Sequence, residues 1–182
     1  MEKWDLYDID RNKTNRTWIR GEKLKSNDFH LIVHVCIFNS NGDMLIQQRQ
    51  SFKEGWPNKW DLTAGGSAIA GDTSQTAVQR ELYEEIGLKI NFQQIRPHLT
   101  INFDNGFDDI FLIEENVQLH TLTLQYEEVQ SVKWAKMEEI FSMIKCGEFI
   151  PYYESFIQVL FDSRKQRGIN KREPESNKKC QT

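Results

Sequence analysis

Three glutamates, Glu81, Glu84 and Glu85, stand within little more than one helical turn of one another. On a helix that advances about 100° per residue, Glu84 lies roughly 60° to one side of Glu81 and Glu85 roughly 40° to the other, so the carboxylates share one face. Carboxylates this close repel one another by roughly a few tenths of a kcal/mol per pair. A hard divalent cation such as Mg²⁺ would offset this repulsion, because it binds through a few carboxylates together with substrate phosphates. The cluster therefore predicts a metal site that handles phosphate, with a solvated acidic surface as the alternative.

The segment before the glutamates reads as a glycine-rich loop that opens a helix. Its glycines let the backbone turn sharply and approach a ligand closely, and they are Gly65, Gly66 and Gly71. Asp72 or Thr73 can cap the helix, and Gly87 can end it in a left-handed conformation. A separate apolar stripe can pack on a core, and it consists of Val78, Leu82 and Ile86.

Loop and helix together resemble the Nudix box, which reads Gly-x5-Glu-x7-Arg-Glu-hydrophobic-x-Glu-Glu-x-Gly-hydrophobic. The residues that match in register are Gly66, Arg80, Glu81, Leu82, Glu84, Glu85, Gly87 and Leu88. One position departs from the pattern, because the first glutamate of the box is Asp72 here. The charge is kept, but the side chain is shorter by one methylene.

The resemblance implies roles for individual residues. Nudix proteins use the positions of Glu81, Glu84 and Glu85, together with the backbone carbonyl at the position of Gly65, as metal ligands. Arg80 resembles the arginine that orients a box glutamate, so Glu81, Glu84 and Arg80 are the expected catalytic residues of the box. The implied cofactor is Mg²⁺, with Mn²⁺ as the alternative.

The reaction that the resemblance implies is hydrolysis of a diphosphate linkage in a nucleoside diphosphate joined to another group. Such chemistry needs a metal that neutralises phosphate oxygens and acidifies a water molecule. The general base varies within the family, and it can be a box glutamate or a carboxylate on a later loop. Glu128 is the main candidate for a later carboxylate, and Asp109 is a second one.

A second resemblance covers the run from His30 through Trp60, which is similar to the corresponding part of isopentenyl-diphosphate isomerases. These isomerases share the Nudix fold but move a double bond, for which they need a cysteine and, two residues later, a metal-binding histidine. Gly65 and Ser67 occupy these two positions here. The chain therefore resembles the isomerase-like branch without its isomerase residues, and we expect a hydrolase. The alternatives are an isomerase and a non-catalytic nucleotide sensor, although a sensor would usually lose box carboxylates.

A basic, aromatic loop precedes the box and supplies candidates for substrate binding. Arg49 and Lys53 can clamp a diphosphate, Lys59 is a weaker candidate, and Gly66 would let the backbone approach the substrate. Separately, His30 and His34 are four residues apart on an expected strand, so they face the same side. A histidine pair can bind a metal, but a pair of core histidines is the alternative.

The remaining sequence indicates the elements that position these residues. Alternating or dense apolar runs predict strands, namely Trp4–Asp8, Thr17–Arg20, His30–Phe38, Met44–Arg49, Ile90–Phe103 with an interruption at Pro97, Phe107–Ile113 and Val129–Ala135. Amphipathic patterns predict helices over Met137–Lys145 and Tyr152–Arg167, and Pro151 suits a first helical position. Strands, one central helix, more strands and C-terminal helices indicate an α/β fold. The resemblance specifies it as a Nudix-type α/β/α sandwich with a mixed sheet.

The chain divides into three expected parts. Residues 1–29 form an N-terminal hairpin extension, which would cover a sheet edge or form a wall for the substrate or for a second subunit. Residues 30–167 form the Nudix domain. The polar residues 168–182 are expected to be disordered.

Composition excludes several classes of function. The 182 residues carry a net charge of −4, with 38% hydrophobic and 27% charged residues, which argues against a surface that coats nucleic acid. Because the N-terminus is polar, we expect no signal peptide there, and no apolar run reaches the ~18 residues that span a membrane. Three widely spaced cysteines form neither a disulfide framework nor a zinc pattern. We expect a cytoplasmic protein that acts on a small-molecule diphosphate without nucleic acid or membrane, and a homodimer is left open.

Overall fold

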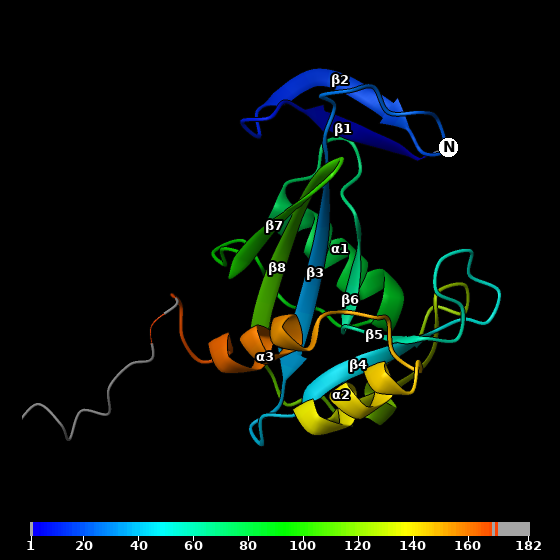
Figure 1. Ribbon diagram of the computed structural model, residues 1–182, viewed down its shortest axis with the longest axis vertical. Helices are drawn as coiled ribbons and strands as arrows, with labels where there is room; N and C mark the ends of the chain where they lie inside the picture. The colour runs from blue at the N-terminus through cyan, green and yellow to red at the C-terminus, as the bar shows by residue number, and fades with distance from the viewer. Residues whose placement is uncertain (1, 169, 171–182) are drawn as a thin grey trace, which may run out of the picture.

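A mixed sheet forms the centre of the protein, as Figure 1 shows for a computed structural model of the chain. The structure describes residues 2–168 and residue 170. Within these residues the sheet has seven strands in the order β5-β4-β3-β8-β7, with β6 paired to β3 and β9 paired to β4. The central pair β3–β8 is parallel, and the other pairs are antiparallel. The strands are β3 (His30–Phe38), β4 (Met44–Arg49), β5 (Trp60–Asp61), β6 (Ala64–Ser67), β7 (Leu99–Phe103), β8 (Gly106–Glu114) and β9 (Val129–Ala135).

Helices cover both faces of this sheet. Alternate residues of β3 point to opposite sides, so Val33, Val35 and Ile37 pack with helix α1 (Ser74–Ile86) in one apolar cluster. Cys36 and Phe38 pack in a second cluster with helices α2 (Met137–Lys145) and α3 (Glu154–Ser163). A short 3₁₀ helix, η1 (Leu119–Thr121), lies before β9. The predicted α/β/α sandwich with a mixed sheet is therefore confirmed.

The N-terminal residues form a hairpin of their own, in which β1 (Lys3–Tyr7) pairs with β2 (Lys13–Ile19). Figure 1 shows this hairpin at one end of the molecule, beyond the ends of β3 and β8. The predicted second strand, Thr17–Arg20, was too short. The turn closes earlier, because Asp8 accepts a hydrogen bond from the backbone N of Asn12 at 2.8 Å and Arg11 adopts a φ of 63°. Polar residues fit in β2 because most of its side chains are exposed.

Several predicted elements have the bounds that the sequence indicates, among them β3, β4, β9 and α2. Two others were wrong at their ends. The predicted strand Ile90–Phe103 begins only at Leu99, because Ile90 and Ile95 pack against the core from a loop. The predicted helix Tyr152–Arg167 covers only Glu154–Ser163.

Pro151 is consequently not a first helical residue. The chain before it is held extended against the sheet, since the backbone N of Ile150 donates to the carbonyl of Trp60 at 2.9 Å. The hydroxyl of Tyr152 then donates to Asp61 at 2.9 Å. These anchors delay the helix until Tyr153 serves as its N-terminal cap.

Of the predicted tail 168–182, the structure describes only residues 168 and 170, so that prediction lies largely outside the described residues. Among the described residues, no helix has the length and apolar character needed to cross a lipid bilayer.

Candidate catalytic site

Helix α1 carries the acidic cluster, and local signals define both of its ends. The Thr73 side chain accepts a hydrogen bond from the backbone N of Thr76, and the Thr76 side chain accepts one from the backbone N of Thr73. Gly87 ends the helix with a φ of 72°, a left-handed conformation that suits glycine. Thr73 is thus the cap, which leaves the side chain of Asp72 available for other contacts.

Glu85 is the most deeply buried of the three glutamates, with 4% of its surface exposed. Its Oε2 atom accepts hydrogen bonds from Gln47 Nε2 at 2.9 Å and from the backbone N of Gly65 at 3.2 Å. Burial, together with the nearby charge of Glu81, raises the pKa of Glu85 from 4.5 to about 8. A buried carboxylate whose hydrogen-bond donors are both neutral is a favourable ligand for a cation.

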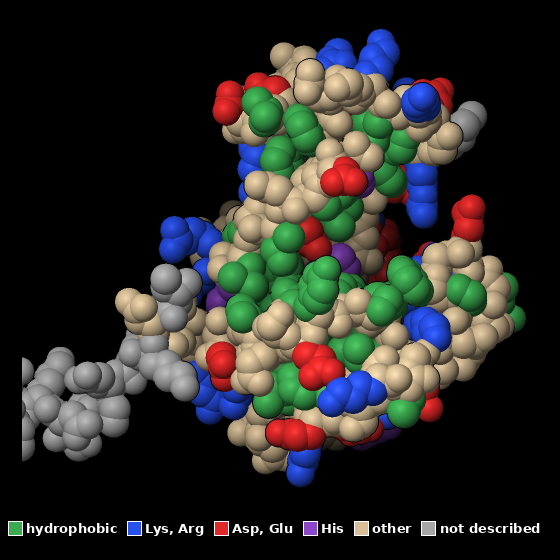
Figure 2. Space-filling model, in the orientation of Figure 1, with side chains coloured by type: hydrophobic (Ala, Val, Ile, Leu, Met, Phe, Trp, Pro, Cys, Tyr) green, Lys and Arg blue, Asp and Glu red, His purple; other side chains and the backbone are tan. Residues whose placement is uncertain are grey.

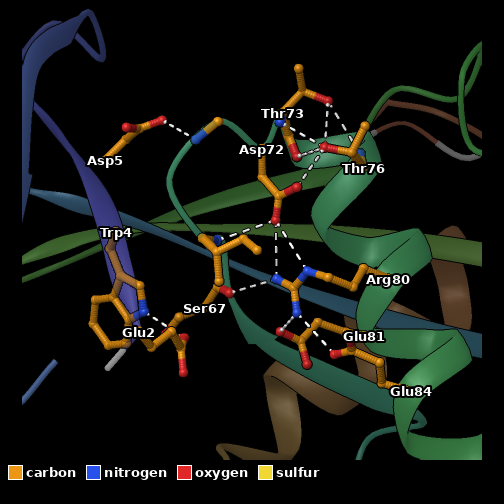
Figure 3. Close-up of polar contacts among 12 residues, drawn as sticks. Glu2, Trp4, Asp5, Ser67, Asp72, Thr73, Thr76, Arg80, Glu81 and Glu84 are labelled. Carbon is orange, nitrogen blue, oxygen red and sulfur yellow. Dashed lines mark hydrogen bonds and ion pairs between the residues drawn. The ribbon is translucent and has the colours of Figure 1, made fainter. Parts of the chain in front are cut away.

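Arg80 holds the other two glutamates (Figure 3). Its Nη1 atom lies 2.9 Å from Glu81 Oε1 and 3.1 Å from Glu84 Oε2. On its other side, Nη2 lies 3.0 Å from Asp72 Oδ2 and also donates to the carbonyl of Ser67 at 3.0 Å. Partial burial opposes the charge of Arg80, yet Glu81 and Asp72 raise its pKa. Asp72 therefore makes a contact with Arg80 through its shorter side chain.

Gly66 leaves room for the carboxylate of Glu81. A Cβ atom at position 66 would lie 2.5 Å from Glu81 Cδ, far inside contact distance. Burial raises the pKa of Glu81, with further contributions from Glu84 and Glu2, although Arg80 opposes them. The field of Glu2 reaches Glu81 from the N-terminal hairpin, so the hairpin and α1 face the same space. Figure 2 shows a hollow between the hairpin and the loop 50–59, in which acidic side chains are visible.

The structure brings the predicted metal ligands near one another without joining them. Among the described residues, no three side chains of the metal-binding types converge on one point. The reason is that Arg80 engages Glu81 and Glu84, whereas Glu85 turns to Gln47 and Gly65. The ligand atoms are nevertheless all hard oxygen atoms, and the Glu85 carboxyl receives its hydrogen bonds from neutral groups. This set fits a divalent ion such as Mg²⁺ or Mn²⁺.

The basic loop lies beside this site, but its cations have protein partners. Lys53 forms an ion pair with Glu128, so the predicted diphosphate clamp contacts the predicted general base. Arg49 Nε donates to the carbonyl of Gly55 at 3.0 Å, and its Nη1 lies 3.6 Å from Asp61. Lys59 bonds to the carbonyl of Gly147, away from the acidic cluster. Among these residues, Glu128 is close enough for its negative charge to contribute to the raised pKa of Glu85.

Asp109, the other candidate base, has a structural partner. It is 2% exposed and accepts hydrogen bonds from both Nη atoms of Arg11, at 3.1 Å and 2.9 Å, and from Thr100 Oγ1 at 2.6 Å. Its carboxylate thus anchors the hairpin to the sheet, with an arginine of the hairpin as its partner.

His30 and His34 share one face of β3, as predicted, but they do not form a metal pair. His30 stacks on Trp4 with ring centroids 4.6 Å apart, and burial lowers its pKa to about 4. His34 Nδ1 lies 2.9 Å from Asp108 Oδ1. Burial opposes the charge of His34, yet Asp108 raises its pKa to about 9.

The ring of His34 also fills the space in front of Gly65. A Cβ atom at position 65 would lie 2.3 Å from His34 Cδ2 and 2.7 Å from the carbonyl oxygen of Val33. Gly65 therefore lacks the cysteine side chain of the isomerases, and the space that such a side chain would need is filled by His34.

Sequence reasoning missed three residues that support the site. Gln47 donates to Glu85, whereas Asp5 and Lys13 of the hairpin contact the loop before α1. Gln47 has only a weak signal, since it directly follows the three apolar residues that begin β4 and is itself the first of three polar ones. Asp5 and Lys13 lie in a polar hairpin, where charged residues are common, so no local pattern distinguishes them.

Fold and box geometry agree with the comparison to known proteins. The family model for the NUDIX domain matches residues 28–159, and the chain belongs to the Nudix family. An uncharacterized Nudix hydrolase of Listeria monocytogenes is 48% identical over 170 residues, which cover 93% of this chain and 99% of the relative. A second uncharacterized Nudix hydrolase, from Listeria innocua, is 47% identical over 170 residues. The family and these two relatives support the assignment of the chain as a pyrophosphohydrolase.

Solved structures share the fold. A crystal structure from Deinococcus radiodurans superposes with a TM-score of 0.70 at 20% identity, covering 87% of this chain and 97% of that one. A bifunctional NMN adenylyltransferase/ADP ribose pyrophosphatase from Francisella tularensis, complexed with AMP and a Mn ion, superposes with a TM-score of 0.56 at 19% identity. This superposition covers 72% of this chain and 41% of the Francisella chain.

Proposed function

We propose that this Nudix protein is a divalent-metal-dependent hydrolase that cleaves the diphosphate linkage of a nucleoside diphosphate derivative, with Mg²⁺ as its usual cofactor and Mn²⁺ as a substitute. The observation that carries the proposal is the buried Glu85 carboxyl, whose two hydrogen-bond donors, Gln47 Nε2 and the backbone N of Gly65, are both neutral. A bound cation would supply charge neutralisation of phosphate oxygens and acidification of a water molecule.

The chain's own residues have defined roles in this proposal. Glu81, Glu84 and Glu85, with the carbonyl of Gly65, would hold the cation, and Arg80 would orient Glu81 and Glu84 when the cation is absent. Gly66 leaves room for the Glu81 carboxylate, beside which the substrate phosphates would bind.

Proton transfer from water is assigned to Glu128 or to a box glutamate. Glu128 is paired with Lys53, and this lysine can transfer its contact from Glu128 to a substrate phosphate, which would free the carboxylate as a base. Asp109 is a poorer candidate, because Arg11 and Thr100 occupy its oxygens.

An exposed aromatic pair next to these residues favours a flat group on the substrate. Phe52 and Tyr126 are 56% and 71% exposed, and their ring centroids are 5.7 Å apart. Phe52 adjoins Lys53 in the sequence, and Tyr126 lies two residues before Glu128. A nucleobase stacks on such rings, typically for about 1–3 kcal/mol, so the pair supports a nucleoside as one part of the substrate.

The proposal is tested by a product screen with purified protein and either Mg²⁺ or Mn²⁺. The substrates are nucleoside diphosphates, sugar nucleotides, dinucleotides and isopentenyl diphosphate, followed by chromatography and by NMR. We expect release of phosphate or a nucleoside monophosphate from at least one nucleoside derivative. We also expect no dimethylallyl diphosphate, because neither Gly65 nor Ser67 can replace the isomerase cysteine and histidine. Formation of dimethylallyl diphosphate at a rate proportional to protein concentration would refute the hydrolase assignment.

A further inference from the structure

The N-terminal hairpin contacts the loop that carries the box into α1, at three consecutive residues. The backbone N of Ala70 donates to the carbonyl of Lys3 at 2.8 Å. The backbone N of Gly71 donates to Asp5 Oδ2 at 2.9 Å, and Lys13 Nζ donates to the carbonyl of Asp72 at 2.7 Å. The hairpin therefore supplies hydrogen-bond partners to backbone groups of the loop that neither β6 nor α1 satisfies.

Asp5 and Lys13 act as one unit in these contacts. Lys13 Nζ lies 2.7 Å from the same Oδ2 atom of Asp5 that accepts from Gly71. Burial opposes the charge of Asp5, but Lys13 and the Gly71 amide together lower its pKa. Gly71 has a φ of 97°, so its conformation is one that other residues rarely adopt. Asp5 thus binds the loop at its sharpest turn.

From this turn, a continuous set of contacts leads to the acidic cluster (Figure 3). The carboxylate of Asp72 accepts from the backbone N of Ile69 at 3.2 Å and lies 3.0 Å from Arg80 Nη2. Arg80 in turn contacts Glu81 at 2.9 Å and Glu84 at 3.1 Å. The direction of the Asp72 side chain depends on the backbone that Asp5 and Lys13 hold.

The hairpin is fixed firmly enough to serve as a support. Arg11 makes two hydrogen bonds to the buried Asp109, and Trp4 stacks on His30 of β3. The backbones of Tyr7 and Phe29 exchange hydrogen bonds of 2.8 Å and 3.1 Å. These contacts tie the hairpin to the central pair of strands, so movement of the loop relative to the hairpin is movement relative to the sheet.

We propose that Asp5, together with Lys13, is a positioning residue of the hydrolase site, which fixes the backbone of residues 70–72 and, through Asp72 and Arg80, places the carboxylates of Glu81 and Glu84. The hairpin is then part of the catalytic apparatus, not only a cover for a sheet edge. For its effect on catalysis, the inference rests on the proposed function.

The full-length variants Asp5→Ala, Lys13→Met and the double variant test this role, with Asp5→Asn as the conservative variant. The amide of Asp5→Asn keeps an oxygen that can accept from Gly71 but loses the charge that attracts Lys13. Arg16→Met is the matched control, because Arg16 belongs to the same hairpin and pairs with the buried Asp28 at 2.5 Å. It removes an ion pair from the hairpin without touching the loop.

Two readouts do not require a substrate. Hydrogen exchange of the segment 68–73 reports the loop, and electron paramagnetic resonance of added Mn²⁺ reports cation affinity. In Asp5→Ala, we expect amide exchange in the loop to rise and Mn²⁺ affinity to fall by about tenfold each, the effect of losing one hydrogen bond to a charged group. Lys13→Met should add little to Asp5→Ala, because the two side chains act as a unit. Asp5→Asn should recover part of both effects.

Activity with a substrate found in the screen completes the test. We expect Asp5→Ala to lower kcat with little change in KM, since phosphate binding by the basic loop is untouched. Equal losses of Mn²⁺ affinity in Asp5→Ala and Arg16→Met would refute positioning and indicate general destabilisation, as would unchanged loop exchange in Asp5→Ala. A wild-type protein that cleaves no substrate would refute the proposed function alone. If the wild type also binds no Mn²⁺, amide hydrogen exchange in the segment 68–73 still tests the positioning role. Exchange must then rise in Asp5→Ala but not in Arg16→Met.

Discussion

Replacement of Glu85 by glutamine should stabilise the metal-free protein while removing its response to metal. The unfolded chain releases this proton near the ordinary pKa of 4.5, whereas the folded chain releases it only near a pKa of about 8. Between these values the unfolded state binds fewer protons than the folded state, so stability falls as the pH rises. At about 1.4 kcal/mol per pH unit, this loss reaches roughly 3 kcal/mol at pH 7. A neutral amide at position 85 does not ionise, so the variant avoids this loss of stability.

The gain is reduced by changes in hydrogen bonding. The backbone N of Gly65 donates to Glu85, and an amide keeps one oxygen for it. Gln47 Oε1 has no hydrogen-bond partner among the described residues, so a new amide N–H can donate to it after a small rotation. Allowing about 1 kcal/mol for imperfect geometry, we expect a net gain of about 2 kcal/mol at pH 7. For a chain of this size that corresponds to roughly 4–8 °C in Tm.

Thermal unfolding from pH 5 to pH 8.5, with and without Mg²⁺ or Mn²⁺, measures both effects. The wild type should lose stability with rising pH when metal is absent and regain it when metal is present, because the cation requires the ionised carboxylate. The glutamine variant should lack the part of this pH dependence that Glu85 contributes, so that its advantage over the metal-free wild type grows with pH, and it should respond little to metal. A variant that is less stable than the wild type at pH 8, or that responds to metal as strongly, would refute this account of Glu85.

Two further predictions concern the neighbours of this group. Asp72→Asn keeps the shape of the side chain but removes its charge opposite Arg80 at 3.0 Å, so we expect turnover to fall by about tenfold, whereas Asp72→Glu should change it little. A steady-state assay that ranks these two variants in the opposite order would contradict the charge-based role. Lys53→Met should raise KM by several-fold because Lys53 adjoins the site through Glu128, whereas Lys59→Met should leave KM unchanged because Lys59 bonds to a distant carbonyl. Equal effects of the two lysine variants would show that the loop acts only through its total charge.

Much of the fold was predictable because local patterns agreed with it. The run His30–Phe38 is apolar on both faces, as a central strand must be, and Met137–Lys145 has one apolar side. Errors occurred where tertiary contacts replaced local preference. The apolar residues of 90–98 suggested a strand, but they pack on the core as a loop, and Pro151 was displaced from a helix start by backbone bonds to β5.

The placement of the acidic residues on α1 was predictable from the sequence, whereas the contacts that support them were not. Spacing alone places Glu81, Glu84 and Glu85 on one helix and Arg80 beside them. The ion pair that holds Asp109, however, joins residues 11 and 109, which are 98 positions apart. Nothing in a single sequence marks such a pairing, since each residue is common on polar surfaces. The same reason hides the link from Asp5 to Gly71.

The close approach of His34 to Gly65 limits how this chain could change its chemistry. A single Gly65→Cys substitution would restore the thiol that the isomerases use, yet its Cβ would lie 2.3 Å from the His34 ring and 2.7 Å from the carbonyl of Val33. The Gly65→Cys variant would be misfolded or strained before it gained any new activity. Trimming His34 first would remove the ring but not the backbone clash, and it would leave Asp108 without its partner. The two activities are therefore separated by a loss of stability that several coordinated substitutions would have to offset, which makes stepwise exchange between them unfavourable in this chain.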